Sequence, residues 1–207
     1  MSAEGVPAGA PDGRPRCWWA GADLERADPL MVTYHDEEWG TPVHDDVDLF
    51  ERLVLESFQA GLSWATILRK REAFRVAFRG FDPSVVAAFG AADRARLMAD
   101  AGIVRNGAKI DATIGNARAV LVIAGEDGSF DGYLAGRLPG PIPRLGRDAM
   151  RGGIPVTTPA AEALSADLRR RGMRFVGPTI VYAFMQSVGL VDDHLPGCFR
   201  YVGPGAG

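Results

Sequence analysis

Four residues near the two ends of the chain have the types and spacing of metal ligands. His194 and Cys198 stand four positions apart, so a helical turn or a tight loop can bring both to one ion. The other cysteine, Cys17, and a second histidine, His35, lie at the opposite end of the chain. A Cys₂His₂ set closes a tetrahedral zinc site and leaves no position for water. These residues predict a structural zinc that ties the N-terminal segment to the C-terminus and takes no part in catalysis.

The same residues have a second interpretation. A cysteine outside a disulfide is often a small buried hydrophobic residue, and the two histidines are then incidental. The remaining histidine, His44, is followed by two aspartates and is interpreted as a surface or capping residue. Residue types alone do not separate a zinc site from two buried thiols.

The elements that must position these residues are helices. Apolar residues recur at helical spacing along most of the chain, and long alternating patterns typical of strands are absent, so we expect a mostly α-helical fold. Helices are predicted from Asp46, capped by Asp45 or Asp46, to Gly61; from the N-cap Ser63; from Asp82-Pro83; in an Ala-rich segment closed by Gly102; over 107–124; from Ser129 to Arg137; from Thr158-Pro159 to Gly172; and over 178–188. Residues 138–157 predict a long connection between two helical subdomains, and 173–179 predict a tight turn.

Length and composition indicate a globular protein. The chain has 207 residues, 47% of them hydrophobic, which is enough for a core, and its two cysteines are too few for a disulfide framework. No apolar run approaches the roughly 20 residues that cross a bilayer, and the N-terminal segment lacks the pattern of a secretory signal. We therefore expect a cytoplasmic protein.

Charge is distributed unevenly along the chain. The formal net charge is −3, but residues 17–60 are strongly acidic, whereas residues 61–118 and 137–175 are basic. A nucleic-acid partner fits this pattern if the basic segments share one face. The alternative is that acidic and basic helices are solvated on opposite sides of the molecule.

Several longer motifs carry a family resemblance. They are Arg16-Cys17-Trp18-Trp19, Tyr34-His35-Asp36-Glu37-Glu38-Trp39-Gly40, Leu55-Glu56-Ser57-Phe58-Gln59-Ala60-Gly61-Leu62-Ser63-Trp64, Ile114-Gly115-Asn116-Ala117-Arg118, Phe175-Val176-Gly177, and Asp193-His194 with Cys198. Over about residues 16–201 the chain closely resembles the DNA-3-methyladenine glycosylase I family, bacterial base-excision enzymes of the helix-hairpin-helix DNA glycosylase superfamily. Residues 1–15 and 202–207 lie outside the resemblance, and we expect a disordered N-terminal tail and a flexible C-terminal one.

The resemblance implies an all-α, helix-hairpin-helix DNA glycosylase fold in two helical lobes, with a structural zinc clip that joins the chain ends. It favours the interpretation of the Cys₂His₂ set as one zinc ion held by Cys17, His35, His194 and Cys198. It also implies that Phe175–Thr179 is the hairpin, whose backbone N–H groups bind a phosphate of double-stranded DNA. Because Pro178 has no N–H, the donors are expected to be Val176, Gly177 and Thr179. The resemblance further implies a monomer.

The implied substrate, an alkylated base flipped out of DNA, explains the aromatic residues and one acid. The 3-methylated adenine is cationic, so aromatic faces attract it, and it leaves the sugar without protonation by the enzyme. The resemblance places the base between two lobes, where Tyr34 hydrogen-bonds it, Trp64 stacks on it, and Trp19 and Trp39 form the walls. Glu56 is expected to be the catalytic carboxylate, accepting hydrogen bonds from the exocyclic amine and offsetting positive charge on the sugar. Without the resemblance, the tryptophans are interpreted as core residues and Glu56 as a solvated helix residue.

One position departs from the family pattern. The chain has Val191-Asp192-Asp193-His194, where the family often has Asn in place of Asp192. Asp192 either activates water and steadies the sugar cation, or orients His194 or caps a turn.

The lysines bear on whether the enzyme also cuts the DNA backbone. Glycosylases that do so use an amine, but neither of the two lysines, Lys70 and Lys109, is near the hairpin or Asp192, so we expect a monofunctional hydrolase.

Two alternatives to this function remain at the level of sequence. The chain could instead be a non-catalytic helical DNA-binding module stabilised by zinc. It could also be a glycosylase for another alkylated or deaminated purine.

Overall fold

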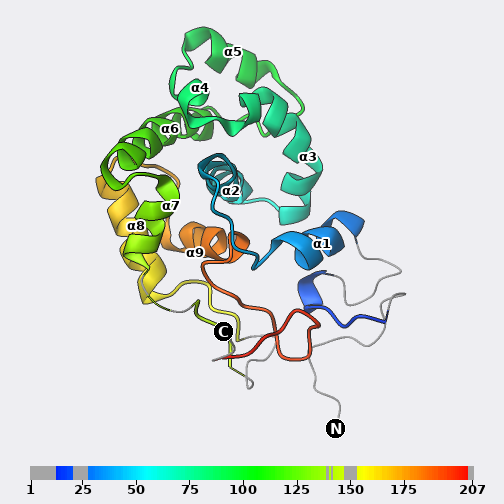
Figure 1. Ribbon diagram of the computed structural model, residues 1–207. Helices are drawn as coiled ribbons and strands as arrows, with labels where there is room; N and C mark the ends of the chain where they lie inside the picture. Colours follow the sequence, from blue (N-terminus) through cyan, green and yellow to red (C-terminus); the bar gives the residue numbers. More distant parts are fainter. Residues whose placement is uncertain (1–12, 21–27, 139, 141, 147–152, 205–207) are drawn as a thin grey trace. The chain divides into compact units, whose positions relative to one another are not determined.

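The computed structural model describes residues 13–20, 28–138, 140, 142–146 and 153–204, and these residues are mostly helical (Figure 1). The helices are α1 (Pro29–Thr33), α2 (Asp46–Gln59), α3 (Trp64–Ala77), α4 (Pro83–Ala87), α5 (Ala91–Ala99), α6 (Gly107–Asp127), α7 (Phe130–Arg137), α8 (Pro159–Arg170) and α9 (Pro178–Ser187), with 3₁₀ turns Trp18–Ala20 and Arg79–Phe81 and a π-helical turn Tyr34–Glu38. Within the described ranges the one β pairing is an isolated bridge between Arg144 and Asp192. The predicted all-α class is confirmed. None of these helices combines the length and apolar character needed to cross a membrane.

Short-range capping sets the helix starts. The Asp45 carboxylate accepts hydrogen bonds from the backbone N–H groups of Val47 and Asp48 at the start of α2, and the Ser63 hydroxyl accepts one from Thr66 N–H at the start of α3. Equivalent caps are Asp82 for α4, Asn106 for α6, Ser129 for α7 and Thr158 for α8. Apart from Asn106, each of these caps was predicted to begin its helix.

Helix ends depart further from the prediction. Helix α5 ends at Ala99, because Asp100 turns the chain by accepting the N–H of Gly102 at 2.7 Å. Helix α8 ends at Arg170, and Gly172 follows it with φ +87°, a conformation that favours glycine. Helix α1 and the π-helical turn were not predicted. The tails predicted for 1–15 and 202–207 fall largely outside the described residues.

The chain divides into two compact units. Unit 1 contains Met1–Pro42, Gly140–Val156 and Met185–Gly207, and unit 2 contains Val43–Pro139 and Thr157–Phe184. Helix α9 therefore begins in unit 2 and ends in unit 1.

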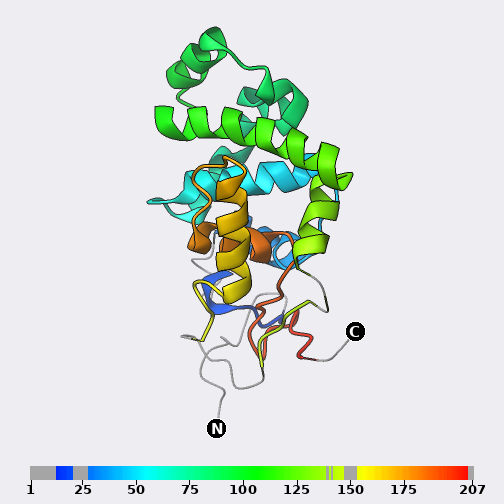
Figure 2. The ribbon, with the colours of Figure 1, turned by 90° about the vertical axis from the view of Figure 1, so that its left-hand side faces the viewer.

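Unit 2 has an aromatic core around α2. Figure 1 shows α2 surrounded by α3, α6 and α7, and in Figure 2 the long helix α6 lies next to α2. Phenylalanine rings fill the interior, with Phe58 and Phe74 centred 4.8 Å apart and Phe78 and Phe81 stacked at 5.4 Å. Helix α2 is consequently buried on most sides, including the position of Glu56.

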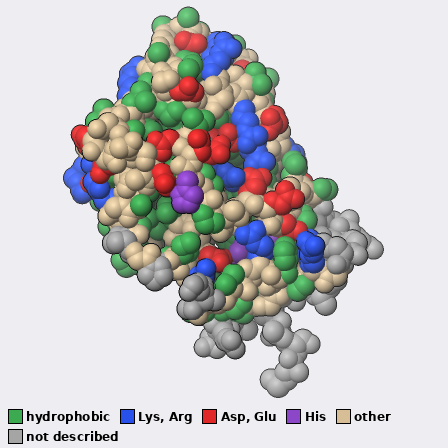
Figure 3. Space-filling view, viewed as in Figure 1, with side chains coloured by type: hydrophobic (Ala, Val, Ile, Leu, Met, Phe, Trp, Pro, Cys, Tyr) green, Lys and Arg blue, Asp and Glu red, His purple; other side chains and the backbone are tan. Residues whose placement is uncertain are grey.

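Basic residues of unit 2 are partly neutralised by acidic neighbours. Acidic and basic side chains are intermingled on the face shown in Figure 3. Arg94 pairs with Asp111 at 2.7 Å, and Arg75 lies 2.9 Å from Glu51 and 2.6 Å from Glu72. Part of the positive charge of residues 61–118 is therefore balanced by acidic side chains within the unit.

Candidate metal centre and base-binding residues

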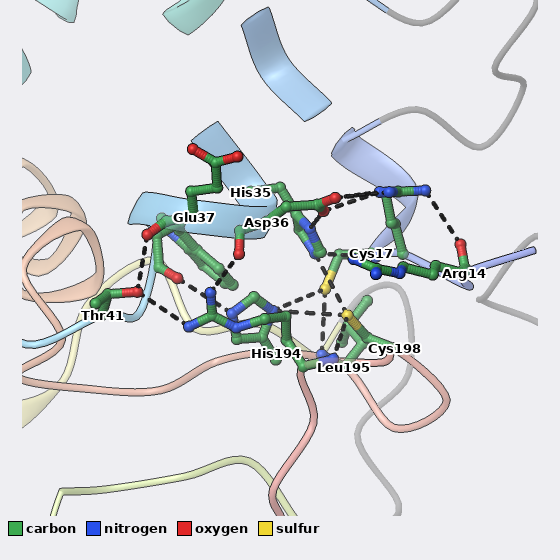
Figure 4. Close-up of polar contacts among 12 residues, drawn as sticks. Arg14, Cys17, His35, Asp36, Glu37, Thr41, His194, Leu195 and Cys198 are labelled. Atoms are coloured by element: carbon green, nitrogen blue, oxygen red, sulfur yellow. Dashed lines mark hydrogen bonds and ion pairs between the residues drawn. The ribbon is translucent and has the colours of Figure 1, made fainter. Parts of the chain in front are cut away.

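The four predicted ligands converge in unit 1 (Figure 4). Cys17 precedes the first 3₁₀ turn, His35 lies in the π-helical turn, and His194 and Cys198 belong to the loop after α9. Their ligand atoms all lie within 4.8 Å of one another, and all four side chains are buried. Cys198 Sγ is 3.4 Å from His35 Nε2, and both sulfur atoms are 3.7 Å from His194 Nδ1. This Cys₂His₂ cluster joins the two ends of the chain and could hold a metal ion.

Neighbouring groups fix which nitrogen each imidazole presents to the cluster. His35 Nδ1 hydrogen-bonds the Asp36 carboxylate at 2.8 Å, so Nε2 faces the sulfur atoms. His194 Nε2 donates to the carbonyl oxygen of Trp39 at 3.2 Å, so Nδ1 faces them. Burial opposes ionisation of Asp36, but hydrogen bonds from Arg16 and His35 hold its pKa below the ordinary value. Each imidazole therefore has one nitrogen available for a metal.

The sulfur atoms are also held as acceptors. Cys17 Sγ accepts the N–H of Leu195 at 3.3 Å, and Cys198 Sγ accepts that of Arg200 at 3.4 Å. A hydrogen bond from the Cys17 thiol lowers the pKa of Cys198, helped by His194 and His35, and the same bond raises the pKa of Cys17. The donor set of two sulfur and two imidazole nitrogen atoms fits a soft or borderline cation such as zinc.

Several supporting residues were not anticipated from the sequence. Asp36 and its partner Arg16, 2.6 Å away, orient His35, and the only available sequence signal was the position of Asp36 next to His35. Gly40 has φ +73°, and a Cβ there would lie 3.2 Å from His194 Nε2, so a larger residue would press on a ligand. These residues build the surroundings of the cluster from contacts distant in sequence.

Asp192 caps the turn before His194, which agrees with one of its predicted roles. Its carboxylate accepts the backbone N–H of His194 at 3.3 Å and lies 3.7 Å from Arg144. The arrangement is that of a turn cap that steadies the loop before the metal ligand.

Three of the predicted base-binding aromatics lie together in unit 1. The rings of Trp19 and Trp39 meet edge to face at 4.9 Å, and the ring of Tyr34 is centred 6.3 Å from Trp19. Trp39 also meets the His194 ring edge to face at 4.7 Å. The aromatic group is therefore packed directly against the Cys₂His₂ cluster.

Glu56 and Trp64 belong to unit 2. Glu56 is only 4% exposed, so its interpretation as a solvated helix residue is wrong. Burial raises the pKa of Glu56 to about 8, opposed by the charge of Arg52, and none of the described residues donates a hydrogen bond to the carboxyl. Trp64 is half-buried as the first residue of α3, just after the cap Ser63. A buried carboxyl without a hydrogen-bond donor is costly and is typical of a binding or catalytic group.

The predicted hairpin is a strained turn held by polar side chains of three helices. Phe175 has φ +55°, which is uncommon for a residue other than glycine. Asn116 of α6 accepts the N–H and donates to the carbonyl oxygen of Arg174, both at 2.9 Å. Ser57 of α2 donates to the carbonyl oxygen of Phe175 at 2.9 Å, and Ser165 of α8 donates to that of Val176 at 2.6 Å.

Three backbone N–H groups of the hairpin have no acceptor among the described residues: those of Val176, Gly177 and Thr179. Val176 is buried, whereas Gly177 is half-buried and Thr179 is exposed. The guanidinium of Arg169 lies 3.3 Å from where a Cβ of Gly177 would stand. Donors at the start of a helix beside an arginine suit an anion such as a phosphate.

Comparison with known proteins assigns the family. The model of a family described as methyladenine glycosylase matches residues 24–201. The chain belongs to the methyladenine glycosylase family. It is 46% identical over 188 residues to DNA-3-methyladenine glycosylase 1 of Escherichia coli K12, covering 91% of this chain and 97% of that protein.

Solved structures of methyladenine glycosylases share the fold. A crystal structure of 3-methyladenine DNA glycosylase I matches with a TM-score of 0.84 and 45% identity, over 90% of this chain and 99% of the other. The Staphylococcus aureus enzyme, solved to define its recognition of 3-methyladenine, matches with a TM-score of 0.79 and 39% identity, over 83% and 90% of the two chains. The resemblance described from sequence motifs is therefore confirmed.

Proposed function

We propose that this protein hydrolyses the N-glycosidic bond of 3-methyladenine in DNA and leaves an abasic site for base-excision repair. The observation that carries the proposal is Glu56, a buried carboxyl to which no described residue donates a hydrogen bond, in a member of a family named for methyladenine. We also propose that it acts in the cytoplasm and as a monomer.

The base-binding residues are proposed to recognise the lesion by its positive charge. Tyr34 hydrogen-bonds the flipped base, Trp64 stacks on it, and Trp19 and Trp39 wall the pocket. An aromatic face attracts a cation by about 0.5–2 kcal/mol, more when water is excluded. Normal adenine, which is neutral, gains none of this attraction, so the pocket selects the methylated base.

Glu56 is proposed to act in its ionised form. With a pKa of about 8 the free protein holds a proton on this carboxyl at neutral pH, and a cationic purine beside it favours release of that proton. The carboxylate then accepts a hydrogen bond from the exocyclic amine and stabilises positive charge that develops on the sugar. Because the methylated base already carries a positive charge, it departs without a general acid.

The ion in the Cys₂His₂ cluster is proposed to be one structural zinc. The support is the donor set of two sulfur and two imidazole nitrogen atoms, each oriented by a neighbouring group. A closed set of four protein ligands leaves no position for substrate, so zinc supplies stability and no chemical step.

Contact with DNA is proposed to centre on the hairpin. The N–H groups of Val176, Gly177 and Thr179 would bind a phosphate near the flipped nucleotide, at the N-terminus of α9. Such contacts fix the register of the duplex without reading its sequence, which suits an enzyme that must find a lesion anywhere.

Neither lysine is placed for strand cleavage. Lys70 donates to the carbonyl oxygens of Ala101 and Gly102, and Lys109 donates to those of Phe58 and Ala60. An amine engaged in this way is not a free nucleophile for a Schiff base, so we propose a hydrolase without lyase activity.

Base release from methylated duplex DNA tests the proposal directly. We expect wild-type protein to liberate 3-methyladenine and Glu56→Ala to liberate at least ~100-fold less. Release that does not depend on Glu56, or no release, would support the non-catalytic DNA-binding module instead.

Free 3-methyladenine should also quench tryptophan fluorescence, whereas a glycosylase for a neutral base should show little response.

A further inference from the structure

Helix α2 carries two neighbouring polar residues with different surroundings. Glu56 has no hydrogen-bond donor among the described residues, whereas Ser57 is 5% exposed and its one hydroxyl proton is shared between two carbonyl oxygens. Ser57 Oγ lies 2.8 Å from the carbonyl oxygen of Leu53, one turn back in the same helix, and 2.9 Å from that of Phe175 in the hairpin. Helix α2 and the hairpin are therefore joined through Ser57, the residue next to the proposed catalytic Glu56.

The bond to the hairpin matters more than the bond within the helix. Leu53 lies inside α2, where its carbonyl oxygen has a helical N–H partner. The carbonyl oxygen of Phe175 has no other donor among the described residues, and Phe175 itself holds the unfavourable φ of +55°. A strained turn persists only where its surroundings hold it, and the hydrogen bond from Ser57 is one of the contacts that hold this turn.

We propose that Ser57 is a positioning residue that keeps the phosphate-binding turn at a fixed distance from Glu56. This inference rests on the proposed function and extends it, since it states how binding of a phosphate at the hairpin sets the position of the reacting sugar. Loss of the hydroxyl lets the turn relax, and the sugar then sits imprecisely against the Glu56 carboxylate. Misplacement of a reacting group by about 1 Å can lower a rate by ~100-fold.

Ser57→Ala tests this role, with two comparison variants. Ser165→Ala removes the equivalent hydroxyl from α8, which holds the next carbonyl oxygen of the hairpin, that of Val176. Thr113→Val removes a buried hydroxyl that bonds only the carbonyl oxygen of Lys109 within α6 and reports general destabilisation. Thermal unfolding checks that each variant is folded at the assay temperature.

Three readouts separate positioning from stability: the single-turnover rate of base release at saturating enzyme, the affinity for duplex DNA containing an abasic-site analogue, and the affinity for free 3-methyladenine. For Ser57→Ala we expect the single-turnover rate to fall at least ~10-fold while free-base affinity stays within about twofold. We expect Ser165→Ala to weaken DNA affinity with a loss of rate at least threefold smaller, and Thr113→Val to keep the wild-type rate.

The inference would be overturned if Ser57→Ala released base at a rate within twofold of wild type. It would also be overturned if Ser57→Ala and Ser165→Ala lost rate equally. A wild-type protein that releases no 3-methyladenine would instead defeat the proposed function. The two failures are therefore distinguishable in one set of measurements.

Discussion

Glu56 is the residue that we propose carries the chemistry, and its carboxyl is buried. Its burial raises its pKa from 4.5 to about 8, so the unfolded chain releases this proton at lower pH than the native protein does. Between these two values the native state binds more protons than the unfolded state, and its stability falls as pH rises. If Glu56 binds a cationic base as proposed, the burial that costs this stability also strengthens its interaction with the cation.

Glu56→Gln should therefore stabilise the protein in alkaline solution. We expect the variant and wild type to unfold at similar temperatures near pH 4.5, with the variant gaining up to roughly 4 kcal/mol relative to wild type by pH 8. Thermal unfolding across this range measures the difference. A gap that does not widen with pH would show that the carboxyl titrates normally.

Among the helices, the starts that short-range contacts determine could be predicted from the sequence. Asp45, Ser63 and Ser129 cap helices within three residues of themselves, so their patterns predicted α2, α3 and α7. The π-helical turn at Tyr34–Glu38 was not predicted, because no short-range pattern marks it. The tight turn over 173–179 was predicted, but its positive φ at Phe175 and the polar side chains from three other helices that hold it were not, because those contacts are distant in sequence.

The arginines before the hairpin should not contribute equally to DNA binding. Arg170 pairs with Asp167 at 2.6 Å, whereas Arg169 has no ion pair among the described residues and lies beside Gly177. We expect Arg169→Gln to weaken DNA binding several-fold and to reduce the salt dependence of log K by about one. Arg170→Gln removes the same charge one position away and should have less than half this effect. Anisotropy of a labelled duplex across a salt series measures both, and equal slopes would argue against a phosphate at the hairpin.

At the scale of the whole molecule, the Cys₂His₂ cluster closes the chain between segments that are far apart in sequence. The prediction that these four residues come together is confirmed, and it rested on residue types and spacing together with the family resemblance. It did not predict Arg16 or the Trp39 carbonyl, because nothing in their types marks them as partners of a ligand.

Removal of one ligand should unfold unit 1 more readily without altering the chemistry itself. We expect Cys198→Ser and His35→Gln each to lower the free energy of unfolding by more than ~3 kcal/mol, with near-normal base release from protein that remains folded. His44→Gln changes an exposed histidine outside the cluster and serves as the control. Native mass spectrometry should find one zinc per wild-type chain, and a stable, fully active metal-free protein would contradict the site.

The proposed mechanism requires that aromatic rings and one carboxyl bind a cationic purine. A crystal structure of this protein with free 3-methyladenine tests this requirement. We expect the base to stack on Trp64, to hydrogen-bond Tyr34, and to donate from its exocyclic amine to Glu56. A base bound elsewhere on the protein, with these three side chains untouched, would contradict it.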